Sequence, residues 1–461
     1  MLDYLVHNSF FINWFGKFEK EELKKFLRLG VIFAIVIGVY WTLRPLKDSI
    51  FTSLVHDPLE VAKNPRLGGA YLPYAKIVSL IILFPIVVFY NKALERFPRQ
   101  HMFYFLGGLY FLLTLAFGLY FMYSPYGLSN PVGDVWRIAG WLWYVLVESY
   151  GSLMVVLFWA FATDTTSPES AKSGFFLVTM LGQLGAILGP TFLTPLGAKY
   201  FGSSAPVIII CAVLILLVIV GIRNFLKVTP KDQLVGFHGK NEAEAESHVE
   251  PGFLEGLKLM GSQKYLLGIF AVVAIYEILS TVIDVNFKMA MTAAHTSEVA
   301  RTEFLGNYAQ KVNLVAFLCL FFGISNVQRY VGVKASLALM PVIICGLVCL
   351  FMFYNDIDIL FWIMVSVKAI NYALNGPTMK QLYIPTTSDV KYKSQAWIET
   401  FGSRSSKATG SAFNILSNAY PNYFFVIISV IAFGLSGIWF FVALYLGNTY
   451  QKAVDQKRVV C

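Results

Sequence analysis

The sequence contains few charged residues for its length. Asp, Glu, Lys and Arg make up 14% of its 461 residues, against about 25% in ordinary soluble domains. Hydrophobic residues make up 57%, and a soluble globule this apolar would expose large sticky patches, because its surface needs polar cover. The composition therefore excludes soluble domains, intrinsic disorder and collagen-like repeats, and it predicts a polytopic membrane protein.

Residues that build catalytic or metal centres are also scarce. The five cysteines are scattered, mostly in apolar stretches, so they predict neither a disulfide framework nor a metal site. The six histidines show no metal-binding spacing, and there is no Gly-rich phosphate loop. We therefore expect no enzyme, no cofactor, no metal and no built-in ATP-driven pump. A membrane-embedded transferase would need a His/Asp or metal constellation at the membrane surface, and the sequence shows none.

Long apolar runs dominate the rest of the chain. A bilayer core takes about 20 apolar residues per helix, and this length predicts an all-α bundle of twelve spans. The predicted spans are 29–50, 71–90, 102–122, 138–162, 174–195, 205–225, 265–290, 305–325, 335–354, 357–380, 395–415 and 422–446. The fourth, fifth, tenth and eleventh are the least hydrophobic, so we expect them to line a cavity.

The longest hydrophilic stretch, 226–264, divides the chain into six-helix halves at 29–225 and 265–446. This 6+6 layout is typical of a major-facilitator-like carrier. Residues 1–28 predict an interfacial amphipathic helix, and 447–461 a polar tail. A weak internal repeat supports the layout, because three residues recur 221 positions later: Lys172, Ser173 and Gly189 as Lys393, Ser394 and Gly410.

The distribution of lysine and arginine over the loops predicts the orientation. With the N-terminus in the cytoplasm, only a few basic residues lie outside: Lys63, Arg66, Arg137, Lys199 and Arg301. Both termini are then cytoplasmic. The N-terminus resembles neither a cleavable signal nor a transit peptide, so we expect a bacterial inner membrane.

Charged residues inside the predicted spans are the most informative feature. Five are acidic: Asp48, Glu148, Glu277, Asp284 and Glu399. Nine are basic: Arg44, Lys47, Lys76, Lys288, Lys311, Lys368, Lys380, Arg404 and Lys407. Each charge at the bilayer centre costs at least about 2.5–3.5 kcal/mol. Pairing every acid still leaves an excess of cations, which predicts a wet cavity for an anionic substrate and does not indicate nucleic-acid binding.

Some of these charges have a structural explanation as well. Lys76 lies near a span end, where snorkelling to the headgroups is the favoured reading. Asp284 and Lys288 are spaced i, i+4 and could form a salt bridge. Arg44, Lys47 and Asp48 are spaced i, i+3, i+4 on one helix face, so an internal salt bridge to Asp48 could explain them too. Arg404 and Lys407 are like charges on one helix face with no acid at matching spacing. That arrangement favours an anion clamp.

Two further polar features fall inside predicted spans. The tenth span carries a polar stripe on one face, formed by Lys368, Asn371, Asn375 and Thr378. Glu148 is isolated in an apolar segment. It either pairs with a cation from another helix or titrates, as carboxylates of proton-coupled carriers do. The small residues of the fifth span predict close helix packing, and they are Gly182, Gly185, Ala186 and Gly189.

Several segments resemble the ATP/ADP carrier family of plastids and obligate intracellular bacteria. They are residues 42–49 (TLRPLKDS), 148–152 (ESYGS), 157–162 (LFWAFA), 283–288 (IDVNFK), and 329–332 (RYVG) onward to Pro341. The most specific match is residues 376–385 (GPTMKQLYIP), followed by Lys391, Lys393, Gly402, Lys407 and Gly410. Two positions in it depart from the family pattern. Met379 stands where the family has lysine, with Lys380 one place later, and Gly376 replaces an acid.

The resemblance implies a nucleotide transporter that works by alternating access. Cations would neutralise the phosphates, Glu148 and Asp284 would pair with them in the empty site, and Gln183 would contact the base. The implied binding residues are Arg44, Lys47, Glu148, Gln183, Asp284, Lys288, Lys311, Lys368, Lys380, Arg404 and Lys407.

The implied substrates leave alternatives open. ATP/ADP exchange and NTP uptake both fit the resemblance, and the departures at Met379 and Gly376 leave room for another phosphorylated metabolite. A proton-coupled major-facilitator symporter of another anionic metabolite is the competing function. The expected partners are the nucleotide and the lipid bilayer, and the sequence is compatible with a monomer.

Overall fold

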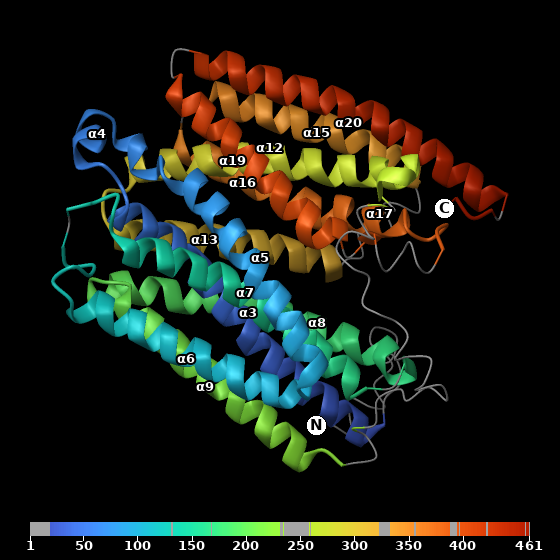
Figure 1. The fold of residues 1–461 in the computed structure, drawn as a ribbon, viewed down its shortest axis with the longest axis horizontal. Helices are drawn as coiled ribbons and strands as arrows, with labels where there is room; N and C mark the ends of the chain where they lie inside the picture. The colour runs from blue at the N-terminus through green and yellow to red at the C-terminus, as the bar shows by residue number, and fades with distance from the viewer. Residues whose placement is uncertain are drawn as a thin grey trace. The chain divides into compact units, whose positions relative to one another are not determined.

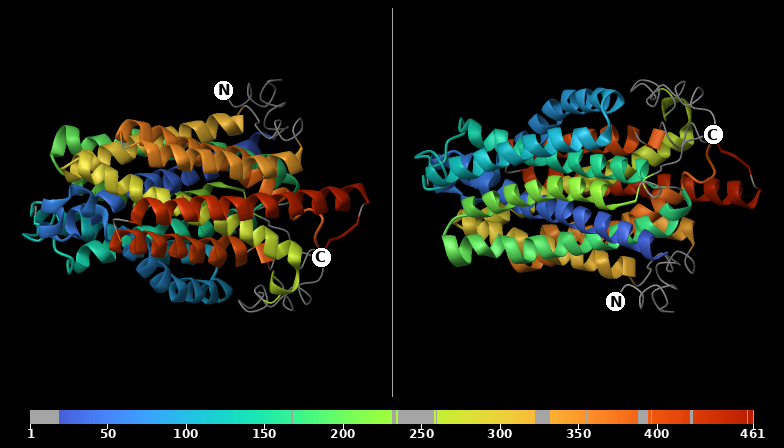
Figure 2. Two further views of the ribbon diagram at one scale, coloured as in Figure 1. Left: turned by 90° about the horizontal axis from the view of Figure 1, so that it is seen from above. Right: turned by 90° about the horizontal axis from the view of Figure 1, so that it is seen from below.

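The computed structural model describes residues 19–130, 132–166, 168–230, 234, 258, 260–321, 332–354, 356–387, 394–395, 397–420, 423–456 and 458–460. Within these residues the regular secondary structure is entirely helical (Figures 1 and 2). Several predictions fall outside them. These are residues 1–18 of the interfacial helix predicted over 1–28, most of the linker 226–264, residues 329–331, and Lys391 and Lys393.

Helices occupy all six predicted spans of the first half. They are α3 (Lys20–Leu54), α5 (Leu72–Arg96), α6 (Arg99–Tyr123), α7 (Ile138–Asp164), α8 (Pro168–Leu196) and α9 (Ala205–Val228). Short elements join them: α4 (Pro58–Lys63), the 3-10 turn η1 (Pro65–Gly69) and the π-helical turn η2 (Gly197–Phe201). The observed helices extend beyond the predicted ends by up to nine residues, as at the start of α3.

The second half follows the same pattern. Its helices are α12 (Lys264–Ala294), α13 (Glu298–Phe321), α15 (Val333–Phe353), α16 (Ile357–Ile370), α17 (Gly376–Gln381), α19 (Ser403–Ala419) and α20 (Phe424–Asp455). The π-helical turn η4 (Asn371–Asn375) joins α16 to α17, and η5 (Ile398–Gly402) leads into α19. The tenth predicted span is therefore α16, η4 and α17 in succession.

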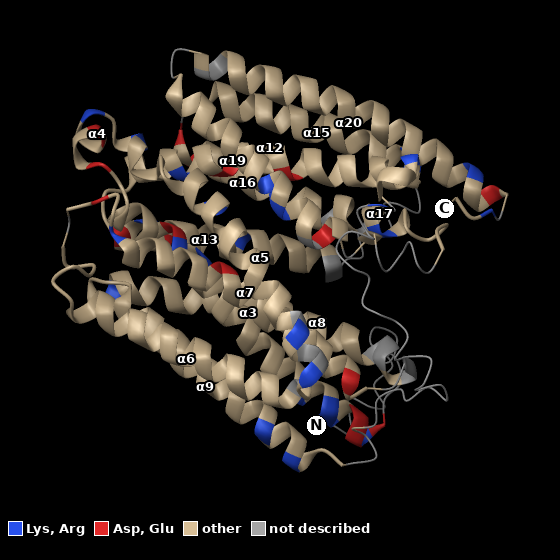
Figure 3. Ribbon diagram, in the orientation of Figure 1, with Lys and Arg blue, Asp and Glu red and all other residues tan. Residues whose placement is uncertain are grey.

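Nine helices of the described residues are long and apolar enough to cross a membrane. The remaining predicted spans correspond to α13, to α16 with α17, and to α19, which are shorter or more polar. The all-helical, twelve-span prediction is confirmed. Figure 3 agrees with it, because uncharged residues cover most of each helix and charged ones gather mainly near helix ends.

Contacts between residues divide the chain into two compact units. Unit 1 contains Met1–Leu59, Ile81–Glu242 and His295–Phe317, and unit 2 contains Glu60–Leu80, Ala243–Ala294 and Leu318–Cys461. Most of α13 therefore packs within unit 1, and the first turns of α5 pack within unit 2. The two units therefore do not coincide with the predicted halves 29–225 and 265–446, and the division into two six-helix halves stays a prediction.

Unit 1 is built around α3, which packs on α7, α8 and α9. The helix α8 approaches α3 closely through the predicted small residues. A Cβ atom at Gly185 would collide with the backbone carbonyl of Ala34, and one at Gly189 with that of Gly38. Glycine at these positions permits the backbone contact, so the packing role of the fifth span is confirmed.

Unit 2 is built around α12, which packs on α16, α19 and α20. A Cβ atom at Gly410 of α19 would press on the carbonyl oxygen of Ile278 in α12. Gly189 and Gly410 are the two glycines of the weak internal repeat. Each lets a later helix approach the central helix of its unit, which gives the repeat a physical meaning.

Candidate functional site

A buried lysine lies near the C-terminal end of α3. Lys47 is 4% exposed. Its ammonium group forms an ion pair with the Glu148 carboxylate of α7 and lies 3.7 Å from Asp48 Oδ1. The same ammonium group stands 4.3 Å from the ring centroid of Tyr144, one turn before Glu148. We call Lys47, Asp48, Glu148 and Tyr144 the Lys47 cluster.

The local sequence explains how α3 presents this lysine. Pro45 has no N–H group, so the carbonyl of Trp41 loses its usual helical donor just before Lys47. Arg44, on the same helix, stacks its guanidinium 5.0 Å from the Trp41 ring. Aromatic faces attract cations, so Trp41 and Tyr144 both stabilise positive charge near this turn.

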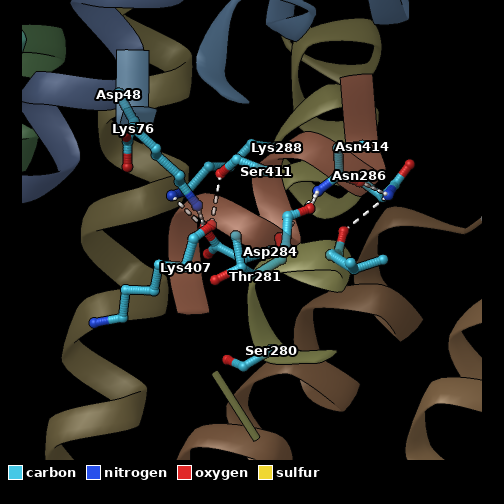
Figure 4. Close-up of polar contacts among 12 residues, drawn as sticks. Asp48, Lys76, Ser280, Thr281, Asp284, Asn286, Lys288, Lys407, Ser411 and Asn414 are labelled. Carbon is cyan, nitrogen blue, oxygen red and sulfur yellow. Dashed lines mark hydrogen bonds and ion pairs between the residues drawn. The ribbon is translucent and has the colours of Figure 1, made fainter. Parts of the chain in front are cut away.

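Unit 2 carries a second buried cluster at the middle of α12. Asp284 Oδ2 accepts hydrogen bonds from Lys288 at 2.8 Å and from Lys76 of α5 at 2.7 Å. Figure 4 shows both ammonium groups converging on this carboxylate. All three side chains are at most 16% exposed. We call Lys76, Asp284 and Lys288 the Asp284 cluster.

Other polar groups of unit 2 surround α12. Lys368 of α16 donates to Ser280 Oγ at 2.8 Å. Glu277 accepts a hydrogen bond from Ser403 Oγ at 2.8 Å, and Lys407 lies 3.6 Å from the same carboxylate. Half of the Lys407 side chain remains exposed. The sequence of α19 contains no acid at matching spacing, but the acidic neighbour of Lys407 comes from another helix, α12.

An amide pair fixes the packing of α19 on α12. Asn286 Nδ2 donates to Asn414 Oδ1 at 2.9 Å, and both side chains are buried (Figure 4). The polar stripe of the tenth span also satisfies itself in part. Asn375 donates to Asn371 at 2.9 Å, and Thr378 to the Leu374 carbonyl at 2.6 Å.

The remaining predicted binding residues differ in how exposed they are. Lys311 on α13 and Arg404 on α19 are half-buried, and Lys380 on α17 is exposed. Met379, where the family has lysine, is buried. Gln183 on α8 has a buried Oε1 atom with no hydrogen-bond partner among the described residues.

Sequence reasoning misread or missed several of these residues. The expectation that Lys76 snorkels to the headgroups is wrong, because its ammonium group binds Asp284. Spacing could have identified Tyr144, four residues before Glu148, and Ser280, four residues before Asp284, since such pairs share a helix face. The pairing of Lys76 with Asp284 spans 208 positions and leaves no local signal.

Comparison with known proteins finds relatives along the whole chain. The chain is 23% identical to ADP,ATP carrier protein 4 of Rickettsia bellii, over 96% of this chain and 94% of the relative. It is 21% identical to ADP,ATP carrier protein 3 of Rickettsia typhi, over 94% and 96%.

Solved structures show the same fold at low sequence identity. A D-xylose-proton symporter gives a TM-score of 0.62 at 12% identity, over 92% of this chain and 97% of that one. A bacterial homologue of the iron transporter ferroportin gives 0.61 at 12%, over 93% and 98%. These similarities support the major-facilitator-like fold.

A match to a family model decides the classification. The model of the TLC ATP/ADP transporter family covers residues 7–450. The motif resemblance is therefore confirmed over nearly the whole sequence, and the chain belongs to the TLC ATP/ADP transporter family.

Proposed function

We propose that this chain carries nucleotides across a membrane by alternating access, with the cations of the Lys47 and Asp284 clusters binding the substrate phosphates. The observation that carries the proposal is the pairing of Lys47, Lys76 and Lys288 with carboxylates deep inside the helices. Relatives named ADP,ATP carrier proteins supply the substrate class.

The pairing suggests how binding and movement are linked. A buried lysine is tolerable only when a negative group compensates it. In the empty state Glu148 and Asp284 supply that charge, and in the loaded state phosphate oxygens would replace them. A conformation with neither partner leaves a cation uncompensated. The charge balance therefore favours movement of the empty, paired protein or the fully loaded protein.

Arginine and lysine would contribute differently to phosphate binding. A guanidinium offers two parallel donors to one phosphate, whereas an ammonium acts as a compact point charge. Arg44, Arg404 and Lys407 are the further candidates, with Lys311, Lys368 and Lys380 behind them. The unsatisfied oxygen of Gln183 would accept a hydrogen bond from an amino group of the base.

Radiolabelled ATP uptake into proteoliposomes tests the proposal. Lys47→Ala should weaken uptake about tenfold or more, because a hydrogen bond to a charged group contributes about 1.5–3 kcal/mol. Lys227→Ala removes an exposed lysine at the end of α9 and should behave as wild type. Equal uptake by both variants would contradict phosphate binding at Lys47.

The same vesicles distinguish exchange from symport. Exchange predicts that efflux of internal nucleotide requires external nucleotide and is unaffected by protonophores. Symport predicts the reverse, with Glu148→Gln abolishing net accumulation.

One observation favours a second candidate function, transport of a different phosphorylated metabolite. The family's lysine position is the buried Met379, and the nearby Lys380 is exposed. A competition panel of nucleotides and sugar phosphates, with and without an imposed proton gradient, separates the candidates. Competition by sugar phosphates but not by nucleotides would favour the second.

A further inference from the structure

A chain of buried hydroxyl groups joins three helices of unit 1 outside the two clusters. The oxygen atoms of Ser49 and Thr302 lie 2.5 Å apart, and Ser204 Oγ donates to Thr302 Oγ1 at 3.1 Å. These side chains come from the C-terminal part of α3, the residue before α9, and the first turn of α13, and none is measurably exposed. Hydroxyl groups this deeply buried need hydrogen-bond partners, and these three provide them for one another.

A carboxyl group lies at the end of this chain. Glu298, the first residue of α13, accepts a hydrogen bond from Thr302 Oγ1 at 2.9 Å, and the Ser204 N–H points to its other oxygen at 3.4 Å. No ion pair within salt-bridge distance involves Glu298 among the described residues. Its direct partners are therefore neutral donors, which a carboxyl group can keep in either protonation state.

The charged groups around this carboxyl are few. Arg301 acts on Glu298 through space, but its guanidinium donates to the His295 carbonyl at 2.8 Å and to the hydroxyls of Thr52 and Ser53. Ser204, the residue before α9, faces Glu298 with its N–H and hydroxyl groups, and Ser49 of α3 reaches Glu298 only through Thr302. Arg301 also acts through space on His56, on which Arg137 and Asp57 act as well.

Two opposing effects act on the proton affinity of Glu298, which precedes the predicted span 305–325. Its place in the first turn of α13 favours the carboxylate through the helix dipole. Burial favours the neutral acid and is the larger effect, so the pKa of Glu298 is raised above its ordinary value.

Every hydroxyl group of the chain can donate a hydrogen bond whether Glu298 is ionised or protonated. With Glu298 ionised, Thr302 donates to the carboxylate, and Ser49 and Ser204 donate to Thr302. With Glu298 protonated, the acid donates to Thr302, Thr302 donates to Ser49, and Ser49 donates to the Leu46 carbonyl at 3.3 Å. The reversal leaves no hydroxyl unsatisfied, and it ends one residue before Lys47.

We infer that the Glu298 carboxyl is a proton-binding site whose protonation loosens the junction of α3, α9 and α13 and thereby sets the rate of transport. The proton comes from water on that side of the protein, because Glu298 is only part-buried. Hydrogen bonds to an ionised acceptor are about twice as strong as neutral ones. The ionised acid therefore holds the three helix ends together more tightly than the neutral acid does. The inference rests on the proposed transport function.

The test is the pH profile of radiolabelled ATP uptake into proteoliposomes, measured from about pH 5 to about pH 8. Wild-type uptake should rise as the pH falls, by about fivefold or more, the lower end of usual coupling between sites. Glu298→Gln should be fast at every pH. Thr302→Val should also lose the pH response, and Thr302→Ser, which keeps the hydroxyl, should retain it.

Glu303→Gln is the matched control, because it removes an exposed carboxylate from the same helix and should keep the wild-type profile. The nucleotide itself also titrates, since the second pKa of a phosphate is about 6. All variants share the substrate, so the difference between Glu298→Gln and Glu303→Gln isolates the protein. A wild-type pH profile in Glu298→Gln would overturn the inference.

Infrared spectroscopy separates this inference from the transport proposal. A protonated carboxyl C=O band should grow as the pH falls and be absent from Glu298→Gln. If the band is lost in Glu298→Gln but wild-type protein takes up no nucleotide, the transport function is contradicted and the proton site is retained. A titrating band unchanged in Glu298→Gln would overturn the proton site even where uptake is normal.

Discussion

In the Lys47 cluster of unit 1 a lysine lies between two carboxylates, whereas in the Asp284 cluster of unit 2 a carboxylate lies between two lysines. Both clusters sit on the central helix of their unit, α3 or α12. Both obey the same rule, that a buried charge needs an opposite partner. They differ in which sign is in excess and in how well water reaches the partners.

The difference assigns different tasks to the two clusters. In unit 1, a phosphate that bound Lys47 under the proposed function would displace Glu148, whose side chain is 38% exposed and can be hydrated. In unit 2, a phosphate would meet two lysines that share one carboxylate, and Asp284 is only 13% exposed. Under the proposed function, unit 2 supplies the stronger attraction for polyanions and unit 1 supplies an exchangeable partner.

The largest effect is expected on removing the shared carboxylate of unit 2. Asp284→Asn removes the carboxylate that Lys76 and Lys288 share, and breaking a buried ion pair in this way costs about 3–5 kcal/mol. The thermal unfolding midpoint in detergent micelles should fall accordingly. Asp455→Asn, at an exposed position near the end of α20, should change stability by less than about 0.5 kcal/mol.

An unfolding midpoint that matches wild type in Asp284→Asn would contradict this prediction. It would mean that water or lipid headgroups already satisfy Lys76 and Lys288, and that the two clusters do not differ in burial.

A smaller effect is expected on removing one of the two lysines. Lys76→Met leaves Asp284 paired with Lys288, so the loss is one hydrogen bond to a charged group, about 1.5–3 kcal/mol. Because Lys76 and Asp284 are in contact, Lys76→Met and Asp284→Asn should not add in the double variant. Unfolding midpoints of the four proteins complete the cycle, and strict additivity would show that the pair is not coupled.

Much of this architecture could be predicted from residue patterns. Apolar runs located nine helices that are long and apolar enough to span a membrane, because each span must satisfy its own backbone in lipid. The i, i+4 spacing of Asp284 and Lys288 made their pair one of the possible readings, and the small residues of α8 predicted a close helix contact without naming its partner. These are local features, and local geometry follows from the helical period.

Pairs between distant segments could not be predicted in the same way. Nothing near Lys76 indicates Asp284, and nothing on α19 indicates Glu277 as the neighbour of Lys407. Such pairs depend on how helices pack. The exposure of Lys380 beside the buried Met379 likewise depends on which face of α17 meets its neighbours, and six residues carry too little pattern to decide it.

The smallest effect on stability, and the sharpest comparison of the two clusters, is expected from Glu148→Gln. Its side chain is 38% exposed and Asp48 remains beside Lys47, so the loss of stability should be smaller than in Asp284→Asn. Equilibrium binding of labelled ATP should tighten, because Lys47 loses the partner with which phosphate competes, while the exchange rate should fall because the empty state is no longer fully paired. Tighter binding with slower exchange would assign Glu148 the role of exchangeable partner. Weaker binding would mean that Glu148 contacts the substrate directly, and an unchanged exchange rate would remove the charge-balance account of coupling from unit 1.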